Sequence, residues 1–135
     1  MKLHTLRLTP NTDLRQALNI ETARRGIAAG FILSTVGSLS RACLRFADES
    51  IDRVIGGPME ILSLSGTLSP DGCHLHIALA DARGAVTGGH VLEGCIVRTT
   101  AEIVIGEAPG VAFSRMQDAE TGYRELVIKP LAAPS

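Results

Sequence analysis

The segment CHLHIALADARGAVTGGH, residues 73–90, organises the sequence around a hairpin and holds three of the chain's four histidines. Its first eight residues alternate between two kinds of side chain, large apolar ones and histidine or alanine, which predicts a β-strand. Asp81 to Gly84 then predicts a four-residue hairpin connection, with Gly84 at a positive φ. Such a connection sets Ala80 opposite Ala85 and returns the chain as a second strand.

The three histidines of this segment converge if the second strand contains one irregularity. Strand alternation places His74 and His76 on the same face, roughly 6.6 Å apart at about 3.3 Å per residue. The four-residue connection leaves His90 one position out of register with His76. A β-bulge at Gly88 and Gly89 would shift the register by that one residue. We therefore expect the hairpin to bring the three imidazoles together through such a bulge.

Three neutral imidazoles at one point are suitable ligands for zinc or another divalent transition metal. The sequence therefore predicts a metal site formed by His74, His76 and His90. Three protein ligands leave a fourth position open to water or a small ligand, which is typical of catalytic zinc. The alternative is that these histidines are merely solvated on a half-exposed face. His4 is isolated in the sequence and receives no role.

Composition and charge narrow the classes of function. The formal net charge is −1 and the chain contains no basic stripe, which disfavours a nucleic-acid surface of its own. The 3 cysteines lie in apolar stretches without a Cys-x-x-Cys pair, so we expect buried thiols in a reducing cytoplasm. The N-terminus lacks the apolar segment of a signal peptide, and no apolar window reaches the length of a membrane span. These features predict a cytoplasmic protein without a membrane partner.

The remaining segments predict one α+β domain over residues 1–135, a mostly antiparallel sheet with one main N-terminal helix. A strand is expected over 2–8 and a helix from Asp13 to about Arg25, ended by Gly26. The apolar stretch 28–46 predicts two strands or one bent strand, and 47–57 predicts a loop. Further strands are expected over 58–69 and after residue 85, and a final hairpin from FSRM (113–116) and YRELVIKP (123–130).

Three carboxylates are candidates for a role near the metal. Glu60 is expected on a face with Leu62 and Leu64, and Glu102 on the apolar side of its strand, while Glu93 is close in sequence to His90. A carboxylate on an apolar face needs a partner. These glutamates are therefore expected either to form a buried ion pair or a subunit contact, or to act as a general base near the metal. No phosphate-binding loop, nucleophile elbow or helix-turn-helix is present, and no catalytic residue is identified.

Several motifs together resemble one family. They are STVGSLSRACLRF (34–46), MEILSLSGTLSPDGCHLHIALADARGAVTGGHVLEG (59–94) and TAEIVIGE (100–107). Gly37-Ser38, the strand EILSLSG, the His-x-His and the Gly-Gly-His give the pattern its specificity. The chain resembles the PPC domain, the domain conserved between plants and prokaryotes, over nearly its whole length.

The resemblance implies an α+β fold with an antiparallel sheet, assembly as a homotrimer, and a metal-associated pattern matched by His74, His76 and His90. It also implies a DNA-binding, transcription-associated label. In plant members AT-hooks with an Arg-Gly-Arg-Pro core contact DNA, whereas the PPC domain mediates assembly. This chain has no such core, and its nearest segment is ARRGIA at 23–28. The alternative function is a metal-dependent enzyme or a small-ligand-binding protein that uses an open zinc position.

Apolar strand faces offer a surface for subunit contacts. Ile61, Ile103 and Ile105 are expected to remain on a second face of the sheet, because one helix cannot cover both faces. We interpret them as sheet surface left for burial between the copies of a homotrimer.

Overall fold

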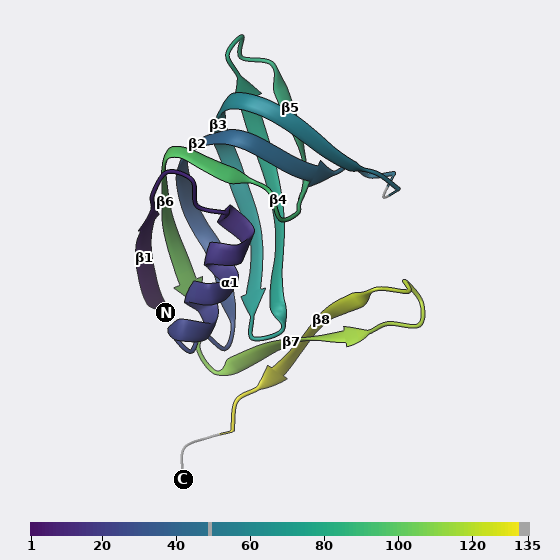
Figure 1. Cartoon of the computed structure of the whole chain (residues 1–135). Coiled ribbons are helices and arrows are strands. Elements are labelled where there is room, and N and C mark those ends of the chain that lie inside the picture. The colour runs from purple at the N-terminus through teal and green to yellow at the C-terminus, as the bar shows by residue number, and fades with distance from the viewer. Residues whose placement is uncertain (49, 133–135) are drawn as a thin grey trace.

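The computed structural model describes residues 1–48 and 50–132. Its elements, labelled in Figure 1, are one helix and eight strands within that range: β1 (Lys2–Leu8), α1 (Leu14–Arg24), β2 (Gly30–Arg45), β3 (Asp52–Ser69), β4 (Gly72–Asp81), β5 (Val86–Val91), β6 (Ile96–Glu107), β7 (Val111–Gln117) and β8 (Arg124–Pro130). All strand pairings are antiparallel, which confirms the α+β class with one N-terminal helix. In the described ranges, no helix has the length and apolar character needed to cross a membrane.

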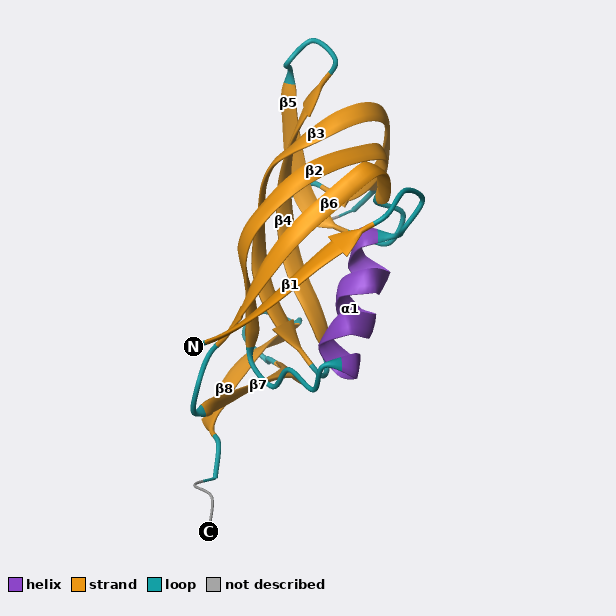
Figure 2. Cartoon of the chain, turned by 90° about the vertical axis from the view of Figure 1, so that its left-hand side faces the viewer, coloured by secondary structure: helices purple, strands orange, loops and turns teal. Residues whose placement is uncertain are grey.

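Six strands form one curved sheet in the order β1-β6-β2-β3-β4-β5. The sheet curls at one end, so that β5 also pairs with β2 through Leu44 opposite Val91 and Arg45 opposite His90. Strands β2, β3, β4 and β5 thus close into a ring there. Figure 2 shows α1 lying along one side of the curved sheet. The β7–β8 hairpin forms a separate two-stranded sheet beyond the other end of β3 and β4 (Figure 1).

The helix begins and ends where the sequence predicts it. The Asp13 side chain caps α1 by accepting from the Gln16 backbone N–H at 3.0 Å. Its second carboxylate oxygen accepts from the Gly94 N–H at 2.7 Å, which ties the start of the helix to the segment after β5. Gly26 follows the helix at a φ of 63°, the left-handed conformation that terminates many helices.

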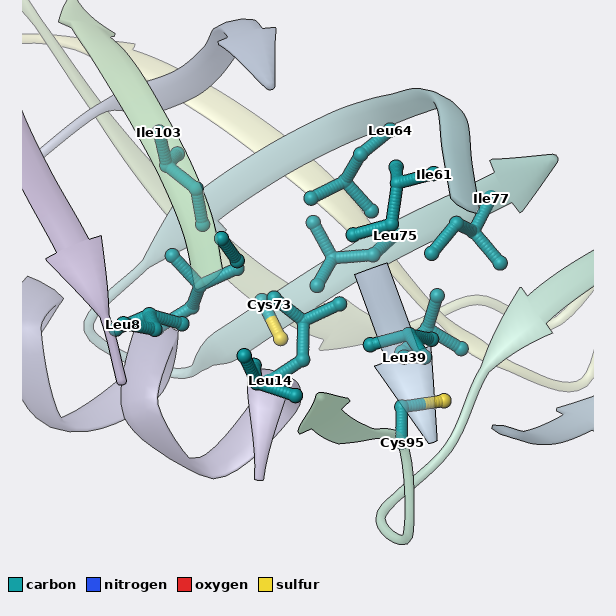
Figure 3. Close-up of a cluster of buried hydrophobic side chains, with 14 of the residues drawn as sticks. Leu8, Leu14, Leu39, Ile61, Leu64, Cys73, Leu75, Ile77, Cys95 and Ile103 are labelled. Atoms are coloured by element: carbon teal, nitrogen blue, oxygen red, sulfur yellow. The ribbon is translucent and has the colours of Figure 1, made fainter. Parts of the chain in front are cut away.

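Strand β4 carries the alternation that its sequence predicts. Cys73, Leu75, Ile77 and Leu79 are all buried, and Figure 3 shows three of them in a cluster with side chains from the helix and other strands. The histidines between them therefore point away from this core. Burial of the apolar face fixes the register of β4, because a slip by one residue would exchange the two faces.

The predicted loop over 47–57 is wrong in its second half, because β3 begins at Asp52. Residues 52–56 pair with the end of β2, which is one continuous strand rather than two. Gly57 lets the backbones approach at this point, since an added Cβ would lie 2.7 Å from the Leu39 carbonyl oxygen. The Gly-Gly-Pro sequence that predicts a loop therefore serves close packing within a long strand.

The apolar residues assigned to subunit contacts are instead in the monomer's core. Ile61, Ile103 and Ile105 have exposed fractions of 5%, 1% and 0%. An irregularity between Ile61 and Ser63 changes the alternation of β3, so that Leu62 is 54% exposed. This register shift places Ile61 on the core face together with Leu64, and periodicity in the sequence does not reveal it. Ile103 and Ile105 follow the regular alternation of β6 and lie on its buried face.

Candidate metal centre

The pairing of β4 with β5 is shifted by one residue from the pairing that the sequence predicts. Ala80 pairs with Val86 rather than with Ala85. The Asp81 N–H donates to the carbonyl of Ala85 at 2.9 Å, which adds one pair before the turn. Gly84 has the predicted positive φ, at 80°. The predicted pairing was therefore wrong by one residue although the turn glycine was correct.

This one-residue shift places His76 directly opposite His90 without any bulge. The bulge predicted at Gly88 and Gly89 is therefore not needed, and the β4–β5 ladder is continuous through both glycines. Gly88 has a different use, because a Cβ there would collide with the carbonyl oxygen of Ile77. The glycine lets the two histidine-bearing strands lie close together.

The three imidazoles form one cluster. Ring centroids are 5.0 Å apart for His74 and His76, 5.2 Å for His74 and His90, and 5.8 Å for His76 and His90. One ligand nitrogen from each ring lies within 4.8 Å of the other two. Two nitrogens bound to one zinc ion lie at most about 4.2 Å apart, since each bond is about 2.0–2.1 Å. Small rotations of the rings would therefore bring the donors to bonding distance.

The protonation state of the cluster suits a metal. Burial, reinforced by the charge of Arg45, lowers the pKa of His90 to about 4. Burial also lowers the pKa of His74, with the charge of Arg115 as the next cause. Both imidazoles are therefore neutral near pH 7 and keep a free lone pair. Within residues 1–48 and 50–132, no hydrogen bond to another side chain or to the backbone occupies the three rings.

The cluster opens into a cavity of about 800 Å³ between the β2–β5 junction and the β7–β8 hairpin. Its charged lining residues are Arg15, Arg45, Asp71, Arg115, Arg124 and Glu125. Four guanidinium groups thus face two carboxylates, an excess of positive charge that the chain's net charge of −1 does not reveal. The cavity combines metal-type donors with a positive wall.

Each arginine is brought to the cavity by a different element. Arg15 lies in the first turn of α1, and its Nη1 donates to the Val91 carbonyl at 3.1 Å. Arg45 ends β2 and pairs with His90 across the β2–β5 junction. Arg115 belongs to β7, and its guanidinium donates to Thr67 Oγ1 at 2.8 Å. Sequence reasoning missed these arginines because the pairings that gather them join distant segments.

The carboxylates proposed from the sequence do not lie at the cluster. Glu60, Glu93 and Glu102 are exposed and none lines the cavity around the histidines. Glu102 accepts a hydrogen bond from the Thr100 hydroxyl at 3.2 Å on the surface. The structure therefore does not support a role for these three residues as a general base near the metal. It also does not place them in a buried ion pair within the monomer. The register shifts in β2 and β3 account for the error at Glu60, because they expose side chains that simple alternation would bury.

His4 has a structural partner that the sequence did not indicate. The ring is 6% exposed, and its Nε2 lies 2.8 Å from Glu107 Oε2. This pair joins β1 to the end of β6, at positions not included in the cavity lining. His4 is therefore separate from the three-histidine cluster.

Curated proteins from a cyanobacterium and a plant are similar in sequence to this chain. The bifunctional protein GlmU of a Synechococcus strain is 51% identical over 132 residues, covering 98% of this chain and 21% of that protein. AT-hook motif nuclear-localized protein 8 of Arabidopsis thaliana is 29% identical over 113 residues, covering 77% of this chain and 29% of that protein. The chain thus spans between a fifth and a third of the length of these relatives.

Solved structures share the fold closely. A hypothetical protein from Salmonella matches with a TM-score of 0.92 and 40% identity, over 96% of this chain and 94% of that one. A metal-containing protein from Archaeoglobus fulgidus matches with a TM-score of 0.82 and 29% identity, over 94% of each chain. The model of the Plants and Prokaryotes Conserved (PCC) domain matches residues 1–109. The chain therefore belongs to this family, the PPC family that its motifs resemble.

Proposed function

We propose that the chain is a metal-binding PPC module in which His74, His76 and His90 hold one divalent transition metal, with zinc as the first choice. The observation that carries the proposal is the set of three ligand nitrogens within 4.8 Å of one another. The neutral state of His74 and His90 and the name of the metal-containing Archaeoglobus relative support it. A bound metal would act as a Lewis acid with an open position toward the cavity.

Metal analysis of protein purified without a histidine tag tests this function. We expect about one divalent metal ion per chain, as the ligand count of the site implies. Protein that stays metal-free after dialysis against zinc, while remaining folded, would contradict the proposal.

We further propose that residues 1–135 form one domain that assembles as a homotrimer in the cytoplasm. Exposed apolar side chains on the strands support a subunit interface: Leu33, Val36, Val54, Leu62 and Val86 are each at least 50% exposed. Gly37 pairs with Ile61, which places Val36 next to Leu62 on neighbouring strands. The three cysteines are buried free thiols, in keeping with a reducing compartment.

Light scattering tests the assembly. We expect a mass three times that of the 14.2 kDa chain. A Leu62→Glu variant should lower this mass toward the monomer, because a carboxylate in an apolar interface loses its hydration. Ile20→Glu is the matched control, since Ile20 is 62% exposed but lies on the helix. A wild-type chain that scatters as a monomer would refute the trimer.

A transcription-associated role is the second candidate, favoured by the likeness to the Arabidopsis AT-hook protein. In this role the domain would assemble subunits, while contact with DNA would need a separate basic element. The net charge of −1 supports this division.

Retention on duplex DNA at several salt concentrations tests direct DNA binding. We expect the chain alone to show no salt-dependent retention, because each phosphate contact would add almost one to the slope of log affinity against log salt. A slope of two or more would show that the surface of this domain contacts phosphates itself, and the division of roles would be wrong.

A further inference from the structure

We propose that the cavity beside the three histidines binds a small oxyanion, a carboxylate or a phosphate, with Arg45 and Arg115 as its guanidinium partners. The inference deepens the proposed metal function and rests on it for one contact, an anion oxygen at the open coordination position. The arginine contacts belong to the chain itself and do not depend on the metal.

The wall of the cavity carries an excess of positive charge. Four arginines and two carboxylates line it, and the imidazoles of His74 and His90 add no negative charge. In the described ranges, none of the four arginines forms an ion pair with a carboxylate within 4.0 Å, whereas Arg24, Arg25 and Arg53 elsewhere on the molecule do. Guanidinium groups gathered without carboxylate partners are typical of a site for an anion.

One of the two carboxylates in the cavity wall, that of Asp71, already accepts a hydrogen bond from the backbone. Asp71 Oδ2 accepts from the Arg115 backbone N–H at 2.9 Å, a contact that ties the second half of β7 to the β3–β4 turn. The Arg115 guanidinium itself turns to Thr67 Oγ1 and leaves its other N–H donors available. The carboxylate thus positions the segment that carries the arginine rather than neutralising it.

The arginines and the three histidines line the same cavity. Arg45 is opposite His90 across the β2–β5 junction, and both residues line the cavity. Arg115 approaches from the β7–β8 hairpin and lines the same cavity as His74. Figure 1 shows the hairpin and the end of β2 on the same side of the molecule. An anion in the cavity would therefore meet positive charge from two separate elements.

The size of the cavity favours a small molecule over a polymer. Its volume of about 800 Å³ is within the usual range for pockets that enclose small ligands. Phe46 and Tyr123 also line the cavity and give it an apolar component beside the arginines. We infer a compact organic acid or phosphate ester, with a charged end toward the histidines and arginines.

Calorimetric titration with acetate and with inorganic phosphate tests the inference, on metal-free and on zinc-loaded protein freed of excess metal. We expect zinc-loaded protein to bind at least one of the two anions. Arg45→Gln and Arg115→Gln should each weaken binding about 10-fold, the loss that follows from one charged hydrogen bond. Arg45→Lys should lose less than Arg45→Gln, because it keeps the charge.

Arg83→Gln is the matched control, since Arg83 lies at the exposed β4–β5 turn and does not line the cavity. It should bind the anions like the wild type. Zinc content and thermal melting are measured for every variant, so that loss of metal or of folding is recognised. The preferred anion distinguishes a carboxylate ligand from a phosphate ligand.

The outcomes separate this inference from the metal proposal. Arginine-dependent anion binding to a protein that takes up no zinc would support the oxyanion site and refute the metal function. Zinc binding without any anion affinity up to millimolar concentration would support the metal function and refute the oxyanion site. Anion binding that is equal in the wild type, Arg45→Gln and Arg115→Gln would overturn the role of the arginines.

Discussion

Replacing His76 by alanine should remove the metal that we propose binds at the three-histidine cluster, while the chain stays folded. The imidazole is exposed on the face of β4 opposite the core, so its removal leaves no cavity among the buried leucines. His74 and His90 alone would supply two ligands, one fewer than the three that catalytic zinc sites commonly use. We expect metal content to fall from about one ion per chain to near zero after dialysis.

The size of the effect follows from the energy of zinc binding. Structural zinc sites bind with about 10–16 kcal/mol shared by four ligands, so that one ligand is worth on the order of 3 kcal/mol. Loss of one ligand therefore weakens binding about 100-fold. Competition with a chromogenic chelator measures this change directly, and circular dichroism shows that the sheet is retained.

His4→Gln is the control variant, because it removes a histidine that lies outside the three-histidine cluster. His4 is buried against Glu107 and is not part of the cavity lining, so the variant should lose some stability but no metal. Equal metal content in His76→Ala and in the wild type would show that the three-histidine cluster is not the binding site. Equal losses in His76→Ala and His4→Gln would point to general destabilisation instead.

The part of this site that could be predicted lies within one hairpin. The alternation of β4 indicates which side chains are buried and that His74 and His76 share a face, because that pattern depends only on neighbours along the strand. The sequence places His90 one residue away from the position opposite His76. The error arises because Asp81 pairs with Ala85 and extends the β4–β5 ladder before the turn. Local sequence thus identified the histidines but not the register in which their strands pair.

The positive wall of the cavity could not be predicted in the same way. Arg45 reaches His90 only because β5 pairs with β2 as well as with β4, and Arg115 arrives on a separate hairpin. These contacts join segments far apart in the chain, and no periodicity indicates them. The net charge of −1 even suggested the opposite, since it averages over the whole surface and hides a local excess.

Gly88→Ala should damage the fold and the metal site together. Its new Cβ would collide with the Ile77 carbonyl oxygen, a backbone atom of the neighbouring strand. Because a backbone group cannot turn aside like a flexible side chain, β5 has to move away from β4. Overpacking of this kind costs about 1–3 kcal/mol of the free energy of unfolding, measured by denaturant titration.

The same displacement moves His90, which lies two residues further along β5 and opposite His76. Metal ligands have to be held within about 0.5 Å of their productive positions, so we expect zinc affinity to fall about 10-fold or more. The variant changes no ligand and no charge. A loss of affinity would therefore show that the close approach of the two strands builds the site.

Gly56→Ala is the matched control for this effect. A Cβ at Gly56 meets nothing within 4 Å, and its φ is not in the positive range. Restricting the unfolded chain at such a position is neutral or stabilises by about 0.4–1 kcal/mol. If Gly88→Ala were destabilised yet bound zinc as tightly as Gly56→Ala, the histidines would tolerate a change in strand spacing. The separation of β4 and β5 would then not be what sets the geometry of the three imidazoles.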